Sequence, residues 1–458
     1  MRLVTTMMLL NRKALSISSF FTIMALAAAT GLQAQDNSPY SRYGIGNLVP
    51  NTNINNRAMG GISAAYADFM SINFSNPASY SRFQALLEER SKQMASGRVI
   101  LDVGLNIDNR TLREPNQPTK FSNTNATFSH VQLGVPLRKN WGMSFGLRPI
   151  SRVGYKIART ERLTDGVTGR PIDTAVTEFN GSGGAFLPSI GTGFAIGNFS
   201  AGINVGYLFG RKEFNTSRFI TNDTVFHYGS NHITNSSFGD LYFNAGAQYR
   251  ITLNKRTTLS LGVAGNLQQD IKGTQDVVRQ VQIGSNFADT VYNQSDVAGS
   301  VTYPASYTGG LVLENTFGST GSFLLGADLM QTKWSNYRYF GAIDSVQDNW
   351  QVRVGGHYRP SAKTGGNYWN NVTYRAGFFF GPDYIRIGNQ IPLYGITFGM
   401  GLPLANYNRL SPYQFTSINV ALEYEQRGNN DNQLKENMFR ISLGLNFSDL
   451  WFTKRKYD

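Results

Sequence analysis

The segment Phe439-Arg440-Ile441-Ser442-Leu443-Gly444-Leu445-Asn446-Phe447 decides the fold of this chain. Long apolar residues alternate with polar or small ones, the period-2 pattern of a β-strand whose two faces meet different surroundings. The same alternation recurs from residue 99 onward, for instance over residues 199–207 and 241–249. One face is apolar and aromatic, whereas the other holds mainly Gly, Ser, Asn and Gln. A soluble sandwich also alternates, but this second face is typical of strands that separate lipid from a polar lumen.

The length and number of these segments predict a transmembrane barrel. Many have ten or more residues, enough to cross a bilayer at a tilt, whereas globular strands usually have about five or six. Short connections alternate with long polar ones over the first eight segments, and the longest covers residues 274–300. We predict an all-β fold, a closed antiparallel transmembrane β-barrel of about 14 strands. The predicted strands are residues 98–107, 121–136, 141–157, 176–196, 198–214, 232–251, 257–273, 301–315, 322–340, 348–360, 371–385, 391–403, 414–427 and 437–449.

The composition excludes several classes of protein. The 458 residues include 42 Lys+Arg and 29 Asp+Glu, a net charge of +13, yet only 16% are charged. The basic residues are scattered, without the dense tract interleaved with aromatics that indicates nucleic-acid binding. Beyond the N-terminus no stretch has the ~18 apolar residues of a spanning helix. With no Cys and only four His, we predict no metal and no cofactor.

Residues 1–34 are predicted to be a secretory signal peptide. Arg12 and Lys13 form its basic start, an uncharged and mostly apolar stretch follows, and Leu32-Gln33-Ala34 supplies the small residue before cleavage. A membrane anchor is the alternative, but the apolar stretch is short and ends in small residues. Together with the barrel pattern, this predicts the outer membrane, with both termini in the periplasm and a short basic tail at residues 450–458.

Residues 35–97 are predicted to form an N-terminal plug, or hatch, in the lumen of the barrel formed by residues 98–449. About fourteen strands enclose a lumen too wide for side chains alone to fill. The segment has no long strand, is rich in Gly, Ala, Ser and Asn, and contains an Asn-Pro turn. A disordered periplasmic linker is the alternative, against which the apolar residues Tyr40, Ile54 and Ile62 argue.

Several motifs are distributed over the mature chain. They are Arg57-Ala58-Met59-Gly60-Gly61, Asn76-Pro77-Ala78, Tyr303-Pro304-Ala305-Ser306-Tyr307, and Asp328 followed by Lys333-Trp334-Ser335. Together they resemble the FadL-type family of outer-membrane transporters for hydrophobic compounds. The resemblance implies a 14-stranded barrel with an N-terminal hatch in which an Asn-Pro-Ala turn is characteristic. The candidate hatch-motif residues are Arg57, Gly60, Gly61, Asn76, Pro77 and Ala78, and no ligand-binding residue is carried over.

The two ends of the mature chain are more similar to a branch of this family that is common in Bacteroidota. The matching stretches are Ser38-Pro39-Tyr40-Ser41-Arg42-Tyr43-Gly44 and Trp451-Phe452-Thr453-Lys454-Arg455-Lys456. The resemblance implies that such proteins also serve protein secretion or surface assembly. Two functions therefore stay open. One is a hatch-gated channel for passive uptake of fatty-acid-like or aromatic molecules, and the other a non-transporting barrel subunit of a secretion or surface-protein assembly complex.

The expected partners follow from these two functions. A lipid-facing barrel meets outer-membrane lipid and lipopolysaccharide, and a channel binds a hydrophobic ligand. A complex subunit binds a secretion-system or surface-lipoprotein partner. The terminal stretch Ser442-Leu443-Gly444-Leu445-Asn446-Phe447 has the pattern that the barrel-assembly machinery reads during biogenesis, although any strand can match it by coincidence.

Two patterns that carry chemistry in enzymes have structural interpretations here. Gly142-Met143-Ser144-Phe145-Gly146 matches G-x-S-x-G, and His130 lies on the preceding predicted strand. The motif sits inside a strand rather than at a strand-to-helix turn, and no third member stands out. Gly191-Thr192-Gly193 precedes no helix, so it predicts no nucleotide site. The Asp and Asn residues of 274–300 lack the spacing of a cation site. We predict no catalytic residue and no enzyme.

Several Trp and Tyr residues fall near predicted strand ends. Indole and phenol rings prefer the bilayer interface, so these residues are predicted to form an aromatic girdle. The alternative is that they line a ligand path on the lumen face. They are Trp141, Trp334, Trp350, Trp369, Tyr337, Tyr339, Tyr374 and Tyr384.

Overall fold

The computed structural model describes most of the mature chain. The described residues are 38–87, 94–115, 117–164, 166–221, 227–283, 286–318, 321–361, 367–404 and 414–451. The predicted signal peptide and almost all of the predicted basic tail therefore lie outside them. No helix in these ranges is both long and apolar enough to cross a membrane.

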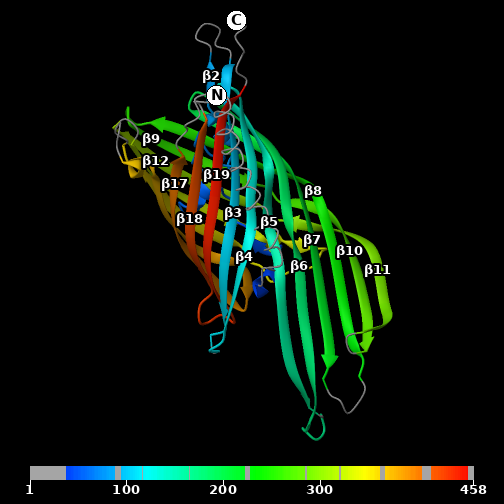
Figure 1. Cartoon of the computed structure of the whole chain (residues 1–458). Helices are drawn as coiled ribbons and strands as arrows, with labels where there is room; N and C mark the ends of the chain where they lie inside the picture. Colours follow the sequence, from blue (N-terminus) through cyan, green and yellow to red (C-terminus); the bar gives the residue numbers. More distant parts are fainter. Residues whose placement is uncertain are drawn as a thin grey trace, which may run out of the picture.

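The described strands form one sheet, which closes because the last strand, β19, pairs with β3 (Figure 1). β9 and β10 are successive parts of one strand beside β8, and β11 and β12 are likewise parts of one strand. Counted in this way, the wall is a closed antiparallel barrel of 14 strands, as predicted. The strands are β3 (Met94–Arg113), β4 (Lys120–Arg138), β5 (Trp141–Thr164), β6 (Pro171–Ile196), β7 (Phe199–Ile220), β8 (Gly229–Thr252), β9 (Thr257–Asn266), β10 (Gln269–Ile283), β11 (Asn286–Tyr303), β12 (Ser306–Phe317), β13 (Gly321–Thr332), β15 (Asn349–Arg359), β16 (Thr373–Ile387), β17 (Asn389–Leu404), β18 (Phe415–Arg427) and β19 (Lys435–Trp451).

The alternation in sequence becomes two faces of the wall. On β7 the side chain of Ile203 is 45% exposed on the outside, while its neighbour Asn204 is buried in the interior. On β19 Leu443 is exposed and Ser442 is buried in the same way. Because lipid offers no hydrogen bonds, the backbone must pair between strands while apolar side chains face outward.

The prediction of a long loop at residues 274–300 is wrong. Most of it forms the paired strands β10 and β11, which continue the barrel wall. The described side chains of residues 274–300 are exposed or half-buried on both faces of this hairpin. The apolar alternation that indicates a lipid-facing strand is therefore lost although the ladder persists. Several other stretches taken as loops extend β5, β6, β7 and β8 to 24, 26, 22 and 24 residues.

The two ends of the barrel therefore differ. At one end, the turn rim, strands join through tight turns such as Lys139-Asn140 and Gly197-Asn198, where Asn140 and Gly197 adopt φ of 63° and 59°. At the other end, the hairpin rim, the ends of β5, β6, β7, β8, β10 and β11 extend past the β3–β4 hairpin (Figure 1). We call the described residues of this extension, within 156–183, 211–237 and 272–299, the wing.

The wall bends inward where two strands are interrupted. Pro304, which has no backbone N–H, lies between β11 and β12. After β13 the short helix η3 (Trp334–Asn336) leads to β14 (Arg338–Tyr339), which pairs with β11. Asp348 fixes this segment, since it accepts a hydrogen bond from the Ser335 amide at 2.9 Å. Burial raises the pKa of Asp348, but hydrogen bonds from Ser335 and Lys333 outweigh it and lower that pKa overall.

This inward segment corrects part of the predicted girdle. Trp334, Tyr337 and Tyr384 are almost fully buried and pack in an interior cluster with Tyr242 and Tyr303. The sequence places them near strand ends, but the interruption of the wall turns them toward the lumen. By contrast, a second group is exposed, as a girdle requires: Trp141, Trp350 and Trp369.

Candidate functional site: a plugged lumen

Residues 38–83, here called the plug segment, lie inside the barrel (Figure 1). The segment contains η1 (Pro39–Arg42), β1 (Asn47–Leu48), α2 (Ile54–Arg57) and η2 (Pro77–Arg82). It bonds to well-separated strands: the Ser38 amide donates to Gly154 on β5 and the Gly60 amide to Thr397 on β17, both at 2.9 Å. Ser38 also bonds to Glu436, at the start of β19 near the hairpin rim. Toward the other end of the segment, the Tyr80 backbone lies against Gly142, next to the turn rim. The plug segment thus crosses the lumen between the two rims.

The first half of the candidate hatch motif anchors this segment to one wall. Asn53 caps α2 by accepting a hydrogen bond from Asn56, and Arg57 at its end reaches Glu423 on β18. Gly60 and Gly61 follow with positive φ of 68° and 84°, a conformation that suits glycine. The sharp turn that they make brings the plug backbone against β15, β16 and β17.

The second half of the motif binds the opposite wall. The Asn76 side-chain amide donates to the Ala64 carbonyl at 2.6 Å and to Val263 on β9 at 3.2 Å. Its oxygen accepts from the Ala78 amide and caps η2, whose first residue is Pro77. Asn76 is fully buried, so each of these bonds replaces one lost to water. The Asn-Pro-Ala turn is therefore a joint between plug and wall.

Glycines on the lumen face of the strands allow the plug backbone to come this close. A Cβ atom on Gly193 of β6 would lie 2.1 Å from the Pro77 carbonyl oxygen, and one on Gly142 of β5 would lie 2.2 Å from that of Tyr80. These glycines belong to the two motifs that resembled nucleotide and nucleophile sites. Their role in the structure is to make room for the plug.

A chain of buried ion pairs joins plug and wall. Glu423 binds Arg57 of the plug and also Arg440 of β19, which in turn binds Asp108 on β3. All four side chains are nearly inaccessible, so each charge depends on its partners. The sequence pattern shows such charges as occasional Arg or Glu on the polar strand face, but it does not show which of them meet.

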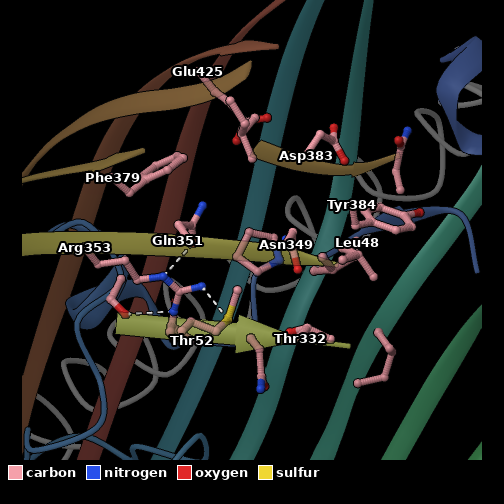
Figure 2. Close-up of a pocket in the computed structure, with 18 of the residues that line it drawn as sticks. Leu48, Thr52, Thr332, Asn349, Gln351, Arg353, Phe379, Asp383, Tyr384 and Glu425 are labelled. Atoms are coloured by element: carbon pink, nitrogen blue, oxygen red, sulfur yellow. Dashed lines mark hydrogen bonds between the residues drawn. The ribbon is translucent and has the colours of Figure 1, made fainter. Parts of the chain in front are cut away.

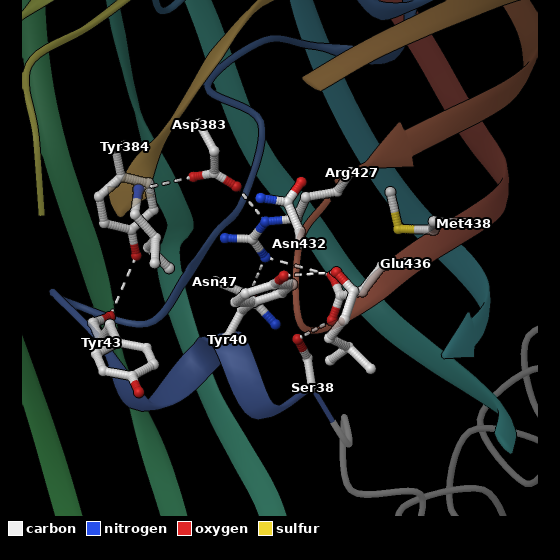
Figure 3. A network of polar contacts seen from close by, with 12 residues as sticks. Ser38, Tyr40, Tyr43, Asn47, Asp383, Tyr384, Arg427, Asn432, Glu436 and Met438 are labelled. Carbon is white, nitrogen blue, oxygen red and sulfur yellow. Dashed lines mark hydrogen bonds and ion pairs between the residues drawn. The ribbon is translucent and has the colours of Figure 1, made fainter. Parts of the chain in front are cut away.

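A second network lies nearer the hairpin rim (Figure 3). Arg427 of β18 binds Asp383 and Glu436, and its guanidinium lies 4.5 Å from the Tyr40 ring centre. Glu436 also accepts the Ser38 hydroxyl hydrogen bond. The first turn of the plug is thereby held by both charge and aromatic contacts.

Between plug and wall lies a cavity of about 250 Å³ (Figure 2). Arg353 reaches into it and is held by Gln351 and by the Gly61 carbonyl at 3.3 Å. The lining is unusually charged for an interior space. Its charged residues are Arg57, Arg110, Arg148, Arg353, Arg427, Arg440, Asp383, Glu423 and Glu425.

One lining residue, Arg148 of β5, stands apart from the ion pairs. It is buried, and its Nε and Nη1 atoms have no hydrogen-bond partner in the described part of the chain. Its guanidinium lies 5.1 Å from the Phe74 ring centre, and the ionisable groups facing it are tyrosines, including Tyr242 and Tyr303. An acceptor such as a carboxylate would satisfy it.

The residues of the nucleophile-like motif do not form a triad. Ser144 donates to Gln132 at 3.4 Å, while His130 contacts Asp102 at 3.0 Å and Ser129 at 3.1 Å. His130 is fully buried, and Asp102 also accepts the amide of Ile72 from the plug. Asp102, which also contacts His130, is therefore another wall residue that binds the plug segment. Among the described residues, no group of three or more His, Asp or Glu side chains is arranged to hold a metal ion.

These features define a class: a transmembrane β-barrel of the outer-membrane type whose lumen is filled by its own N-terminal segment. The chain belongs to the BamG family, whose model matches residues 15–458. No curated protein matches it.

Solved structures confirm the predicted FadL-type fold. A Pseudomonas aeruginosa FadL homologue superposes with a TM-score of 0.51 at 14% identity, covering 90% of this chain and 100% of that one. The Pseudomonas putida toluene transporter TodX gives 0.51 at 14% identity, with coverage of 89% and 99%. At such identity the likeness of both structures to this chain is one of fold.

Proposed function

We propose that this chain is an outer-membrane barrel that serves as a subunit of a secretion or surface-protein assembly complex, with its lumen kept closed. The wing carries the proposal. β6 has 26 residues, about 85 Å of strand, whereas an apolar band of about 25 Å takes roughly ten tilted residues. With the hairpin rim facing outward, more than half of such a strand stands outside the cell as a sheet on which partners can dock.

The fastening of the plug segment supports a closed lumen. Moving the plug would separate Arg57 from Glu423 and Ser38 from Glu436. Breaking one buried pair by removing a partner typically costs about 3–5 kcal/mol, because the remaining charge is left uncompensated. A plug held by this ion pair and by further buried hydrogen bonds to the wall suits a stable scaffold.

The cavity lining supports the same function. An apolar molecule gains about 25 cal/mol per Å² on leaving water only if it enters an apolar, dry pocket. Most of the charged groups that line the cavity are already paired with one another. An apolar ligand offers them neither a hydrogen bond nor an opposite charge, so its binding does not stabilise them. Export by the predicted signal peptide and recognition of β19 by the barrel-assembly machinery complete this proposal.

The test is purification of the tagged full chain from its native membrane in mild detergent. We expect one or more other proteins at a fixed stoichiometric ratio after size-exclusion chromatography. A lone barrel that carries only lipid, at native expression and low detergent, would contradict the proposed function.

A second candidate is the uptake of hydrophobic molecules through a rearranging hatch, which Arg148 favours. Its unsatisfied guanidinium lies in the cavity that Tyr242, Tyr303 and Trp334 also line, a setting that fits a carboxylate with an apolar body. The similar P. putida protein is a toluene transporter. Under this candidate, Arg148→Leu weakens binding of a medium-chain fatty acid to the purified barrel about tenfold, measured by calorimetry, whereas Lys255→Leu at the turn rim leaves it unchanged.

A further inference from the structure

The hydrogen-bond ladder between β4 and β5 is much shorter than its neighbours. It covers only Val131–Arg138 of β4 and Trp141–Leu147 of β5, although β5 continues to Thr164 and stays paired with β6 to that point. The pairing ends at Leu147, and toward the hairpin rim β4 and β5 diverge (Figure 1). One edge of β5 is therefore separated from the barrel wall along its outer half.

The part of this edge nearer the turn rim already binds an added strand. β1 of the plug pairs with it, Asn47 opposite Arg152 and Leu48 opposite Ser151. The Val49 amide donates to Ile150 and the Ser38 amide to Gly154, both at 2.9 Å. The plug thus covers the edge up to Gly154, and no described strand covers residues 157–164 on this side.

The uncovered part lies outside the membrane. Ile157 is sixteen residues beyond Trp141 at the turn rim. That length is about 50 Å of strand, or about 40 Å of height at a tilt near 40°, which exceeds an apolar band of about 25 Å. An aqueous strand edge with a regular backbone is a template for another chain, and proteins usually cover or disrupt such edges.

The charges on this edge indicate what it binds. Arg159, Glu161 and Arg162 are exposed. Glu161 lies 3.7 Å from Arg218 of β7, so its charge is already offset within the wing. Arg159 and Arg162 remain to attract a ligand of opposite charge.

We infer that residues 157–164 of β5 bind an extended, acidic segment of a partner protein by β-strand addition, continuing the strand that the plug begins. This inference rests on the proposed function, because it names the surface by which the barrel joins its complex. In strand addition the backbone supplies affinity, and alternate side chains supply specificity.

Because the chain has no Cys, single cysteines give a clean crosslinking test on the full-length protein in its native membrane. Ala158, Thr160 and Arg162 lie on one face of β5, so each is replaced by Cys in turn. Each cysteine is labelled with benzophenone-maleimide, whose photoactivated carbonyl inserts into nearby C–H bonds of an unmodified partner. We expect photo-adducts whose partner residues, mapped by mass spectrometry, shift by two for each two-residue step and lie in an Asp/Glu-rich stretch. Thr216→Cys on β7, which has a strand on both sides, is the matched control and should form no adduct.

A charge test separates this inference from the proposed function. Arg159→Glu with Arg162→Glu should reduce the co-purified partner at least tenfold, whereas Lys255→Glu with Arg256→Glu at the turn rim should not. Heat-modifiable migration in gels verifies that each barrel is folded. If the charge variant still co-purifies the partner and no position on β5 gives adducts in the expected register, the inference is wrong and the proposed function is unaffected. Adducts at twice the mass of this chain would show a second copy on the edge and also overturn it. If wild type has no stoichiometric partner, the function itself fails.

Discussion

Arg57 of the plug forms a two-point ion pair with Glu423 of β18, with Nε 2.7 Å from Oε2 and Nη2 3.2 Å from Oε1. The two side chains are 4% and 3% exposed. Parallel bonds of this kind fix orientation as well as distance, which a lysine in place of the arginine does not reproduce. The pair therefore sets where the plug sits against the wall.

Replacing Arg57 by Met should loosen the plug. Glu423 would keep Arg440 but lose its partner on the plug, at a cost of about 3–5 kcal/mol. We expect faster proteolysis within residues 38–83 and larger single-channel conductance in planar bilayers. Arg57→Lys should give a smaller effect, and Lys255→Met, on the exposed turn rim, should give none. Unchanged protease resistance in Arg57→Met would show that this pair does not hold the plug.

Gly193→Ala should displace the plug although it adds a single methyl group. The new Cβ would lie 2.1 Å from the Pro77 carbonyl oxygen, and overpacking of this kind costs about 1–3 kcal/mol or more. Gly309→Ala on β12 is the matched control, since its Cβ would meet no atom nearer than 4.0 Å. The temperature at which the unheated gel band converts should fall for the first variant and stay within error for the second. Equal shifts would refute the close approach.

Asn76→Ala should weaken the other joint of the plug. It removes the hydrogen bonds to Ala64 and Val263 and the cap of η2, and each such bond contributes about 0.5–1.5 kcal/mol. We expect increased hydrogen exchange of residues 63–83, measured by mass spectrometry, with little change on β13. Protection that stays at the wild-type level over residues 63–83 would argue against this role.

Deletion of residues 38–78 should leave an assembled barrel with altered permeability. The wall closes through β19 and β3, which pair from Trp451 to Lys435 without the plug. Heat-modifiable migration should persist, while conductance rises. If the deletion abolishes membrane insertion, the N-terminal segment is part of the wall's folding unit and not a separable plug.

The residue alternation along the chain was sufficient to predict the wall of the barrel. For β19 the predicted residues 437–449 and the observed Lys435–Trp451 agree closely, because lipid on one side and a polar lumen on the other force an alternation that local sequence displays. The pattern predicts wrongly where that asymmetry ends: the described side chains of residues 274–300 are exposed or half-buried on both faces, so these strands show no apolar alternation. The motif at Arg57 and Asn76 was found by resemblance, but its contacts were not.

The contacts that hold the plug in the lumen become visible only in the folded barrel. Arg57 and Glu423 are 366 residues apart in sequence, and Trp334 faces inward only because the wall breaks beside it. Which charges on the polar strand faces meet depends on register, tilt and the path of the plug, and these are set by closure of the whole barrel. The two-residue alternation in the sequence predicts on which face of a strand a side chain lies. The residue that this side chain meets across the lumen depends on the three-dimensional structure.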